Sequence, residues 1–230
     1  MQGLFTSQKL ERIKKSSVAI FGLGGVGGYA LEALARSGVT NFSLFDGDVI
    51  EPSNINRQLL ALTSTIGMPK VEVARMRISE INEASNVFTL FKMLKPDKDN
   101  SLNFCFLDKV DAIVDATDDV NLKAFLALEA ERRGMLIISS GGTGNRVDSS
   151  HFCIEDIYKT SGCPLCRALR QRTRKMGVTR LPMVYAKDTH TPKRLTENKR
   201  KTPTEHFISS TAWAPAIAGL MMAEYVISKL

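Results

Sequence analysis

The residues best suited to chemistry lie in a glycine-rich turn, which follows an apolar run, and at Asp46. The glycines of this turn are Gly22, Gly24, Gly25 and Gly27. The first permits a tight turn out of a strand, the second lets backbone amides approach a phosphate, and the last lets the next helix pack closely. Asp46 ends the following apolar run, where a carboxylate can accept a hydrogen bond from a ribose hydroxyl. The pattern predicts a nucleotide site, and the glycines alone do not distinguish NAD from ATP.

The residues that follow this acid favour ATP. A dehydrogenase does not need the run PSNINRQ at positions 52–58. We expect Ser53 to cap a short helix, which would place Asn54 and Arg57 on its first turn. The guanidinium of Arg57 could then donate to the outer phosphates of ATP.

Two further charged residues complete the predicted site. Lys70 begins the next expected helix, where the helix dipole disfavours a cation unless an anion such as triphosphate lies nearby. Asp118, in the motif DATDD, follows another strand, so its carboxylate can reach the carboxyl edge of the sheet and hold Mg²⁺. Arg57, Lys70 and Asp118 are therefore the catalytic candidates. Singly, they could also be a surface ion-pair former, a solvated lysine and a helix cap.

Apolar runs and helical stripes alternate along the chain. Strands are expected at 17–22, 41–46, 87–93, 110–117 and 135–142, and helices at 29–38, 69–82, 121–133 and 215–230. This order predicts an α/β fold with a doubly wound, mainly parallel sheet and a Rossmann-like nucleotide-binding half. We interpret residues 1–230 as a single domain. Its nucleotide-binding part is 17–144, and its substrate and dimer part is 145–230, with a polar basic loop at 186–206.

The positive charge of the chain is concentrated in its second half. The net charge is +7, and twelve Lys or Arg residues lie between Arg167 and Lys201 against two acidic residues. Such a stripe suggests a polyanionic partner, and the alternative is a solvated loop. The candidate RNA phosphate contacts are Arg167, Arg170, Arg172, Arg174 and Lys175.

The composition excludes two classes of protein. The most apolar segment, 214–227, is too short to cross a bilayer, and no signal peptide is recognisable. Four cysteines in 230 residues are too few for a disulfide scaffold. We therefore expect a cytoplasmic protein that does not associate with membranes.

Four motifs resemble one enzyme family. GLGGVG, FDGDVIEPSNINRQ, GMPK and DATDD are similar to the family of ThiF, MoeB and the ubiquitin-activating enzymes, which adenylate a carboxylate with ATP. The resemblance implies that Asp46 binds ribose and that Asp118 binds magnesium. The triphosphate ligands that it implies are Asn54, Arg57 and Lys70. It also implies a homodimer.

The second half resembles one branch of that family. Residues 141–178, the run PMVYAKD and the final helix are similar to the tRNA threonylcarbamoyladenosine dehydratases. These enzymes adenylate the side-chain carboxylate of threonylcarbamoyladenosine, and the activated acyl group is attacked from within the same side chain to give a cyclic product and AMP. The resemblance implies ATP and Mg²⁺ as cofactors and a tRNA carrying threonylcarbamoyladenosine as partner.

Three alternatives stay open. An adenylyltransferase for a ubiquitin-like sulfur carrier would use a sulfur-transfer partner protein, although residues 186–214 lack the cysteine that thioester-forming relatives place there. The second alternative is a catalytically silent relative that binds nucleotide or RNA. In the family, an arginine of the N-terminal segment reaches across the dimer, and this chain has no such arginine there unless Arg12 or a lysine replaces it. A nicotinamide oxidoreductase comes last.

The motif CPLC contributes one pair of thiols, Cys163 and Cys166. A closed zinc site needs four ligands, and Cys105 and Cys153 are isolated in the sequence, so we do not expect zinc. A redox role could be assigned to the pair, but we interpret it as incidental.

Overall fold

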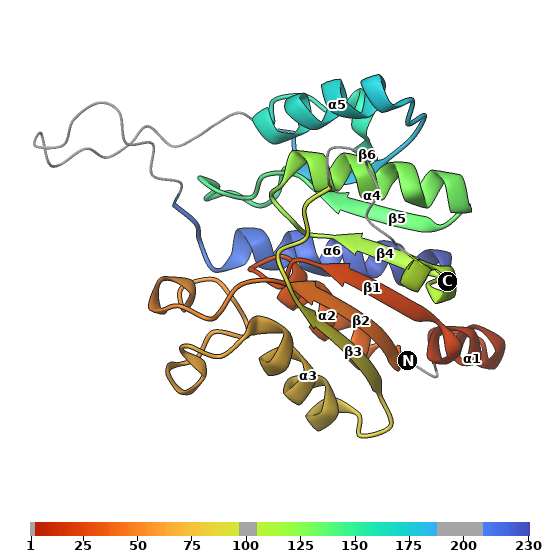
Figure 1. Cartoon of the computed structure of the whole chain (residues 1–230), viewed down its shortest axis with the longest axis vertical. Coiled ribbons are helices and arrows are strands. Elements are labelled where there is room, and N and C mark those ends of the chain that lie inside the picture. The colour runs from red at the N-terminus through yellow and green to blue at the C-terminus, as the bar shows by residue number, and fades with distance from the viewer. Residues whose placement is uncertain (1–2, 97–104, 188–208) are drawn as a thin grey trace, which may run out of the picture.

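A computed structural model of the chain describes residues 3–96, 105–187 and 209–230. A seven-stranded sheet runs through it in the order β3–β2–β1–β4–β5–β7–β6 (Figure 1). The strands are β1 Ser17–Phe21, β2 Asn41–Asp46, β3 Asn86–Phe91, β4 Ala112–Asp115, β5 Leu136–Ser140, β6 Phe152–Asp156 and β7 Pro182–Ala186. All neighbours pair in parallel except β6 and β7, which are antiparallel. The expected mainly parallel sheet is confirmed.

Helices cover both faces of this sheet (Figure 1). They are α1 Ser7–Lys15, α2 Gly27–Arg36, α3 Lys70–Ile81, α4 Val120–Arg133, α5 Pro164–Met176 and α6 Trp213–Lys229. Apolar side chains of α2, α3 and α6 form one buried cluster, and those of α4 and α5 form a second. Two separate cores, each between helices and sheet, are what a doubly wound fold requires. No helix within the described ranges is both long and apolar enough to cross a membrane.

Three elements of the second half, β6, α5 and β7, were not predicted from the sequence, and the antiparallel pairing of β6 was not expected. In α5 the buried face consists of Cys166, Leu169 and Thr173 only, so its apolar stripe is weak beside the basic residues. Of the expected loop at 186–206, Ala186 belongs to β7, and 188–206 lies outside the described residues.

The carboxyl ends of β1 and β4 meet at the point where the strand order reverses. Phe21 and Asp115 are partners in the parallel register of these two strands. Loops leaving adjacent strands toward opposite faces open a crevice at such a switch point. The glycine turn follows β1 and the DATDD motif spans the end of β4, so both border this crevice.

Candidate functional site

The glycine turn is held by backbone contacts that leave no room for side chains. Gly22 has φ 85°, and a Cβ added there would lie 2.8 Å from the carbonyl oxygen of Ala116. A Cβ on Gly27 would lie 1.8 Å from the oxygen of Gly22, which fixes the close approach of α2 to the turn. Gly24 has no atom nearer than Gln58 Nε2 at 3.8 Å, so its backbone is open to a ligand.

A cleft of about 360 Å³ lies at this edge of the sheet. The predicted site residues that line it are Gly22, Gly24, Gly25, Asp46, Asn54, Arg57, Lys70 and Asp118. Gly27 is not in the lining and acts through the packing of α2. Apolar side chains of Phe21, Phe45, Leu94 and Leu122 form another part of the wall. The cleft thus offers an apolar surface for a base beside charged groups for phosphates.

Asp46 joins the end of β2 to the glycine turn. Its Oδ2 accepts a hydrogen bond from the backbone N–H of Leu23 at 2.6 Å, and its Oδ1 accepts one from Asp48 at 2.8 Å. Each carboxylate oxygen keeps a further lone pair for a ribose hydroxyl. Burial raises the pKa of Asp46, an effect that Lys70 and the two N–H groups partly offset.

Lys70 is not a solvated lysine. It is 5 % exposed, and its Nζ lies 2.8 Å from Asp48 Oδ2 across the cleft wall. The anion that the sequence analysis required near the start of α3 is therefore present in the chain itself. A triphosphate entering the cleft could share or replace this carboxylate as the partner of Lys70.

The run PSNINRQ forms a turn that differs from the expected one. The short 3₁₀ helix Pro52–Asn54 begins with proline at its first position and has Glu51 as its cap, so the prediction that Ser53 is the cap was wrong. Proline supplies the fixed φ that suits a first helical position. Arg57 lies beyond the helix, and its Nη1 donates to the oxygen of Ser53 at 2.7 Å, which directs the guanidinium along the cleft.

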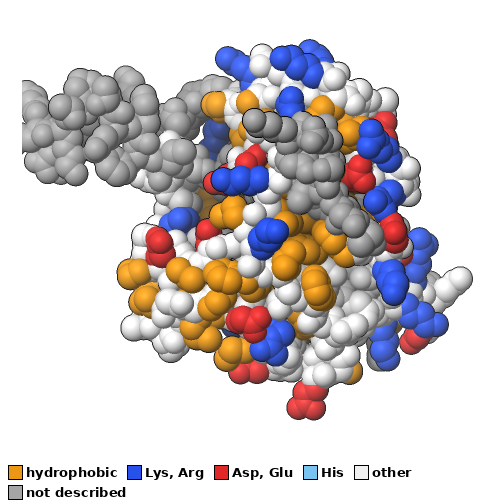
Figure 2. All heavy atoms as spheres, in the orientation of Figure 1, with side chains coloured by type: hydrophobic (Ala, Val, Ile, Leu, Met, Phe, Trp, Pro, Cys, Tyr) orange, Lys and Arg blue, Asp and Glu red, His pale blue; other side chains and the backbone are white. Residues whose placement is uncertain are grey.

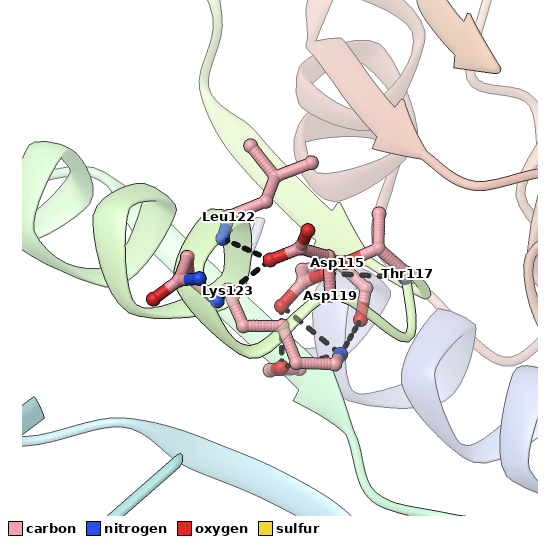
Figure 3. Close-up of polar contacts among 7 residues, drawn as sticks. Asp115, Thr117, Asp119, Leu122 and Lys123 are labelled. Carbon is pink, nitrogen blue, oxygen red and sulfur yellow. Dashed lines mark hydrogen bonds and ion pairs between the residues drawn. The ribbon is translucent and has the colours of Figure 1, made fainter. Parts of the chain in front are cut away.

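The DATDD loop carries one carboxylate with a structural role and another that is exposed at the cleft. Asp119 caps α4, since its Oδ1 accepts from the N–H groups of Asn121 and Leu122 (Figure 3). Asp118 does not serve as the cap and is exposed at the cleft. A carboxylate placed in this way fits a magnesium ion that also contacts phosphates.

A buried ion pair lies beneath the DATDD loop and holds it in place. Lys123 of α4 and Asp115 of β4 are both 0 % exposed, and Nζ lies 3.2 Å from Oδ2 (Figure 3). Ser139 donates to the same carboxylate at 2.5 Å and accepts from Lys123 at 3.1 Å. Thr117 donates to the other carboxylate oxygen through both its amide and its hydroxyl. Every polar group of this cluster is thereby satisfied.

The structure adds lining residues that the sequence analysis did not assign. Gln58 is 8 % exposed, and its Oε1 has no hydrogen-bond partner among the described residues. Lys92 follows β3 and lines the same cleft. Lys92 stands near the carboxyl end of the expected strand 87–93, which was a usable signal, whereas the unpaired oxygen of Gln58 depends on tertiary packing.

The basic residues proposed for RNA lie on α5, on the face opposite its buried one. Arg167, Arg172, Arg174 and Lys175 are exposed, and Lys and Arg side chains gather over α5 at the top of Figure 2. Arg170 is partly buried and donates to the backbone oxygen of Thr160 at 2.5 Å. The structure therefore assigns it a local contact, which leaves it less available than its neighbours.

A second hollow, of about 640 Å³, lies at the amino edge of the sheet. Arg12 lines it together with Asp111 and the C-terminal Leu230. Arg12 is thus remote from the nucleotide cleft of its own chain.

The model of the ThiF family matches residues 1–230. The chain belongs to the ThiF family. Within it, the chain is 37 % identical over 230 residues to the tRNA threonylcarbamoyladenosine dehydratase of Bacillus subtilis, covering 96 % of this chain and 89 % of that protein. It is 33 % identical to the molybdopterin-synthase adenylyltransferase of Haemophilus influenzae, over 63 % of this chain and 58 % of that protein.

Solved structures of ThiF-like proteins share the fold. The Escherichia coli tRNA N6-threonylcarbamoyladenosine dehydratase superposes with a TM-score of 0.86 and 26 % identity, covering 99 % of this chain and 90 % of that one. It has been solved in complex with AMP and in complex with ATP. This likeness extends over both halves of the chain.

Proposed function

We propose that this protein is an ATP-dependent tRNA threonylcarbamoyladenosine dehydratase. The observation that carries the proposal is the cleft, which gathers the glycine turn, Asp46, Arg57 and Lys70 at one edge of the sheet. The similarity to the B. subtilis dehydratase spans nearly the whole chain and supports this member of the family over the others.

ATP fits the cleft with its base toward the apolar wall and its phosphates toward the glycine turn. Asp46 accepts from the ribose, and the N-terminus of α2 presents backbone N–H groups and partial positive charge to the phosphates. Arg57 and Lys70 add two cations, one half-buried and one buried. Buried cations interact more strongly with phosphate than exposed ones, because less water screens them.

The chemistry is an adenylation followed by a cyclisation. A substrate carboxylate oxygen attacks the α-phosphorus of ATP, the bond to the β-phosphate oxygen breaks, and pyrophosphate leaves. A nucleophile within the same side chain then attacks the acyl carbon and AMP departs with the carboxylate oxygen. Arg57 and Lys70 stabilise the negative charge that moves onto the leaving pyrophosphate. No protein nucleophile is required, because the attacking group belongs to the substrate.

Magnesium is part of the proposal. Asp118 would hold it, since this carboxylate is exposed at the cleft while Asp119 is engaged as the cap of α4. Bound to the phosphates, the ion would neutralise charge on the pyrophosphate. Asp118 would fix the ion relative to the DATDD loop, which the buried ion pair of Lys123 and Asp115 keeps in place.

The tRNA is proposed to contact the exposed basic face of α5. Arg167, Arg172, Arg174 and Lys175 can neutralise backbone phosphates, and such contacts position a nucleic acid without selecting its sequence. Cytoplasmic location is proposed on the same basis, because the substrate is a tRNA.

A homodimer is also proposed. Exposed apolar side chains of Ile55, Leu62 and Ile66 lie on the loops between β2 and α3, where orange side chains gather at the lower left of Figure 2. Contiguous exposed apolar surface is typical of an interface between subunits. Light scattering of the purified protein would give its mass in solution, and a monomer would contradict the proposal.

Pyrophosphate release from MgATP tests the activity. The purified chain is assayed with tRNA carrying threonylcarbamoyladenosine and with the same tRNA transcribed without the modification. We expect release only with the modified tRNA, together with a mass decrease of the nucleoside by one water. Release with a sulfur-carrier protein and none with the modified tRNA would point instead to the adenylyltransferases that the chain also resembles.

Arg57→Ala separates chemistry from folding in this assay. Arg57→Ala removes a cation that lines the cleft and is half-buried, so the fold should persist while pyrophosphate release falls. ATP binding without release by the wild-type protein would identify a catalytically silent relative.

A further inference from the structure

The cysteines of the CPLC motif lie together at the start of α5. Cys163 is the N-cap residue, Pro164 is the first helical residue and Cys166 lies in the first turn. Both thiols are free, and the two residues are separated by only Pro164 and Leu165 at the start of the helix. A Cys-x-x-Cys pair at a helix start brings the two sulfurs onto one side of the first turn, within reach of a disulfide.

The sulfur of Cys163 lies beside the backbone of Gly142 and at the positive end of a 13-residue helix. The neighbouring Cys166 thiol, followed by nearby backbone N–H groups, lowers the pKa of Cys163 to about 5 against the opposing effect of burial. The neighbouring Cys163 sulfur and burial raise the pKa of Cys166. At neutral pH the pair is thus one thiolate beside one thiol.

The pair packs against the backbone that leaves β5. A Cβ added to Gly141 would lie 3.0 Å from Cys166 Sγ, and one added to Gly142 would lie 3.8 Å from Cys163 Sγ. These glycines are close neighbours of Ser139, which bonds the carboxylate below the DATDD loop. The cysteines therefore occupy the same edge of the sheet as the nucleotide cleft, although the proposed adenylation does not use them.

We propose that Cys163 and Cys166 are a redox-active dithiol that a small hydroperoxide oxidises to a disulfide. The thiolate of Cys163 attacks one peroxide oxygen, the O–O bond breaks, and the other oxygen leaves as hydroxide or alkoxide. The sulfur of Cys166 then attacks the resulting sulfenic acid, the S–O bond breaks, and water leaves with the thiol proton. Two electrons pass from the sulfurs to the peroxide, and a small external dithiol returns them.

Burial selects the class of oxidant. Cys163 is 5 % exposed and Cys166 is 0 % exposed, so a bulky protein disulfide cannot align with either sulfur. A hydroperoxide needs only a narrow path and one open side of the sulfur. Cys153 supplies an internal comparison, because burial raises the pKa of its thiol and it has no neighbouring thiol among the described cysteines.

Peptide mass spectrometry of the full chain tests the proposal. The reduced protein is treated with equimolar hydrogen peroxide, free thiols are alkylated under denaturing conditions, and the peptides are analysed. We expect the peptide holding both cysteines to lose two hydrogen atoms and to escape alkylation, with full reversal by dithiothreitol. Oxidation should exceed that of Cys153 by more than about tenfold in rate.

Two variants identify the roles. In Cys166→Ala the sulfenic acid should persist on Cys163 and react with dimedone, and in Cys163→Ser no disulfide or dimedone adduct should form at position 166. Circular dichroism checks that both variants are folded, and the wild-type measurement stands without them. Oxidation of the pair no faster than that of Cys153, or copurification of one zinc per chain that blocks alkylation of the pair, would overturn the proposal.

Discussion

Lys123 and Asp115 form an ion pair in which neither side chain reaches solvent. The lysine comes from the first turns of α4 and the aspartate from the end of β4, so the pair ties a helix to the strand before it. Its remaining hydrogen-bonding capacity is met by Ser139, Thr117 and the backbone oxygen of Asp115. The loop between them carries Asp118 into the cleft, so this pair determines where the proposed magnesium ligand lies.

Removing the charge of Lys123 should lower the stability of the protein. Lys123→Met would leave the carboxylate of Asp115 buried without its counter-charge, and we expect the free energy of unfolding to fall by about 3–5 kcal/mol. Ser139→Ala keeps both charges and removes one hydrogen bond from each of them, so it should cost less, about 2 kcal/mol. Urea unfolding of both variants checks the prediction, and equal losses would show that the charge is not the important element.

Replacing Gln58 should separate binding from stability. Gln58→Met keeps the volume of the side chain and removes an oxygen that is buried without a partner, so the melting temperature of the free protein should not fall. If that oxygen meets the bound nucleotide, the dissociation constant for ATP should rise by about fivefold or more, as expected for one lost hydrogen bond. Calorimetric titration measures this constant. An unchanged affinity would place Gln58 outside the contacts to ATP.

Gly27→Ala should disrupt the site through its backbone. The new Cβ would overlap the oxygen of Gly22 at 1.8 Å, and neither backbone segment can withdraw without opening the turn. We expect a loss of about 3 kcal/mol or more in stability and no ATP binding. Gly3→Ala is the matched control, because no atom lies within 4 Å of its added Cβ. Its stability should equal that of the wild-type protein.

Nucleotide affinity should depend on the ionisation of Asp46. Burial raises the pKa of this carboxyl, so the charged acceptor for ribose is lost at a pH above the ordinary value of 3.8. The affinity advantage of the wild-type protein over Asp46→Asn should be about tenfold at neutral pH and should shrink as pH falls through this raised pKa. The ratio of the two dissociation constants cancels the titration of the nucleotide itself. A ratio that stays constant as pH falls to the ordinary value of 3.8 would contradict the prediction.

The raised pKa of Asp46 also makes the stability of the fold depend on pH, in the direction opposite to that of the nucleotide affinity. Because the folded state raises the pKa of Asp46, its contribution to stability is fully present below the pKa of the unfolded chain. That contribution is lost as pH rises through the folded-state value. Asp46→Asn should therefore remove this part of the pH dependence in denaturant unfolding.

Charge reversal on α5 should weaken tRNA binding. Arg172→Glu with Lys175→Glu would remove two exposed cations from the basic face and lower the slope of log affinity against log salt by about 1.5. The double change Lys14→Glu with Lys15→Glu alters the net charge equally, on exposed residues of α1. Filter binding at several salt concentrations compares the two. Equal losses would mean that only the net charge matters.

The local part of the site could be predicted from the sequence. Gly22, Gly27 and Asp46 act within one strand–turn–helix–strand unit, and their spacing alone places them at one edge of a parallel sheet. The alternation of apolar runs and helical stripes predicts the five strands β1 to β5 for the same reason, since periodicity reflects burial within each element.

Tertiary structure decided the rest, because it depends on contacts between segments far apart in the chain. Lys70 forms an ion pair with Asp48 in the chain itself. Lys123 contacts Asp115 and Ser139 only when α4 packs on β4 and β5. No periodicity reports which polar groups become buried together. The surroundings of the thiols at the start of α5 could not be predicted for the same reason, because Gly142, which lies beside them, follows another strand.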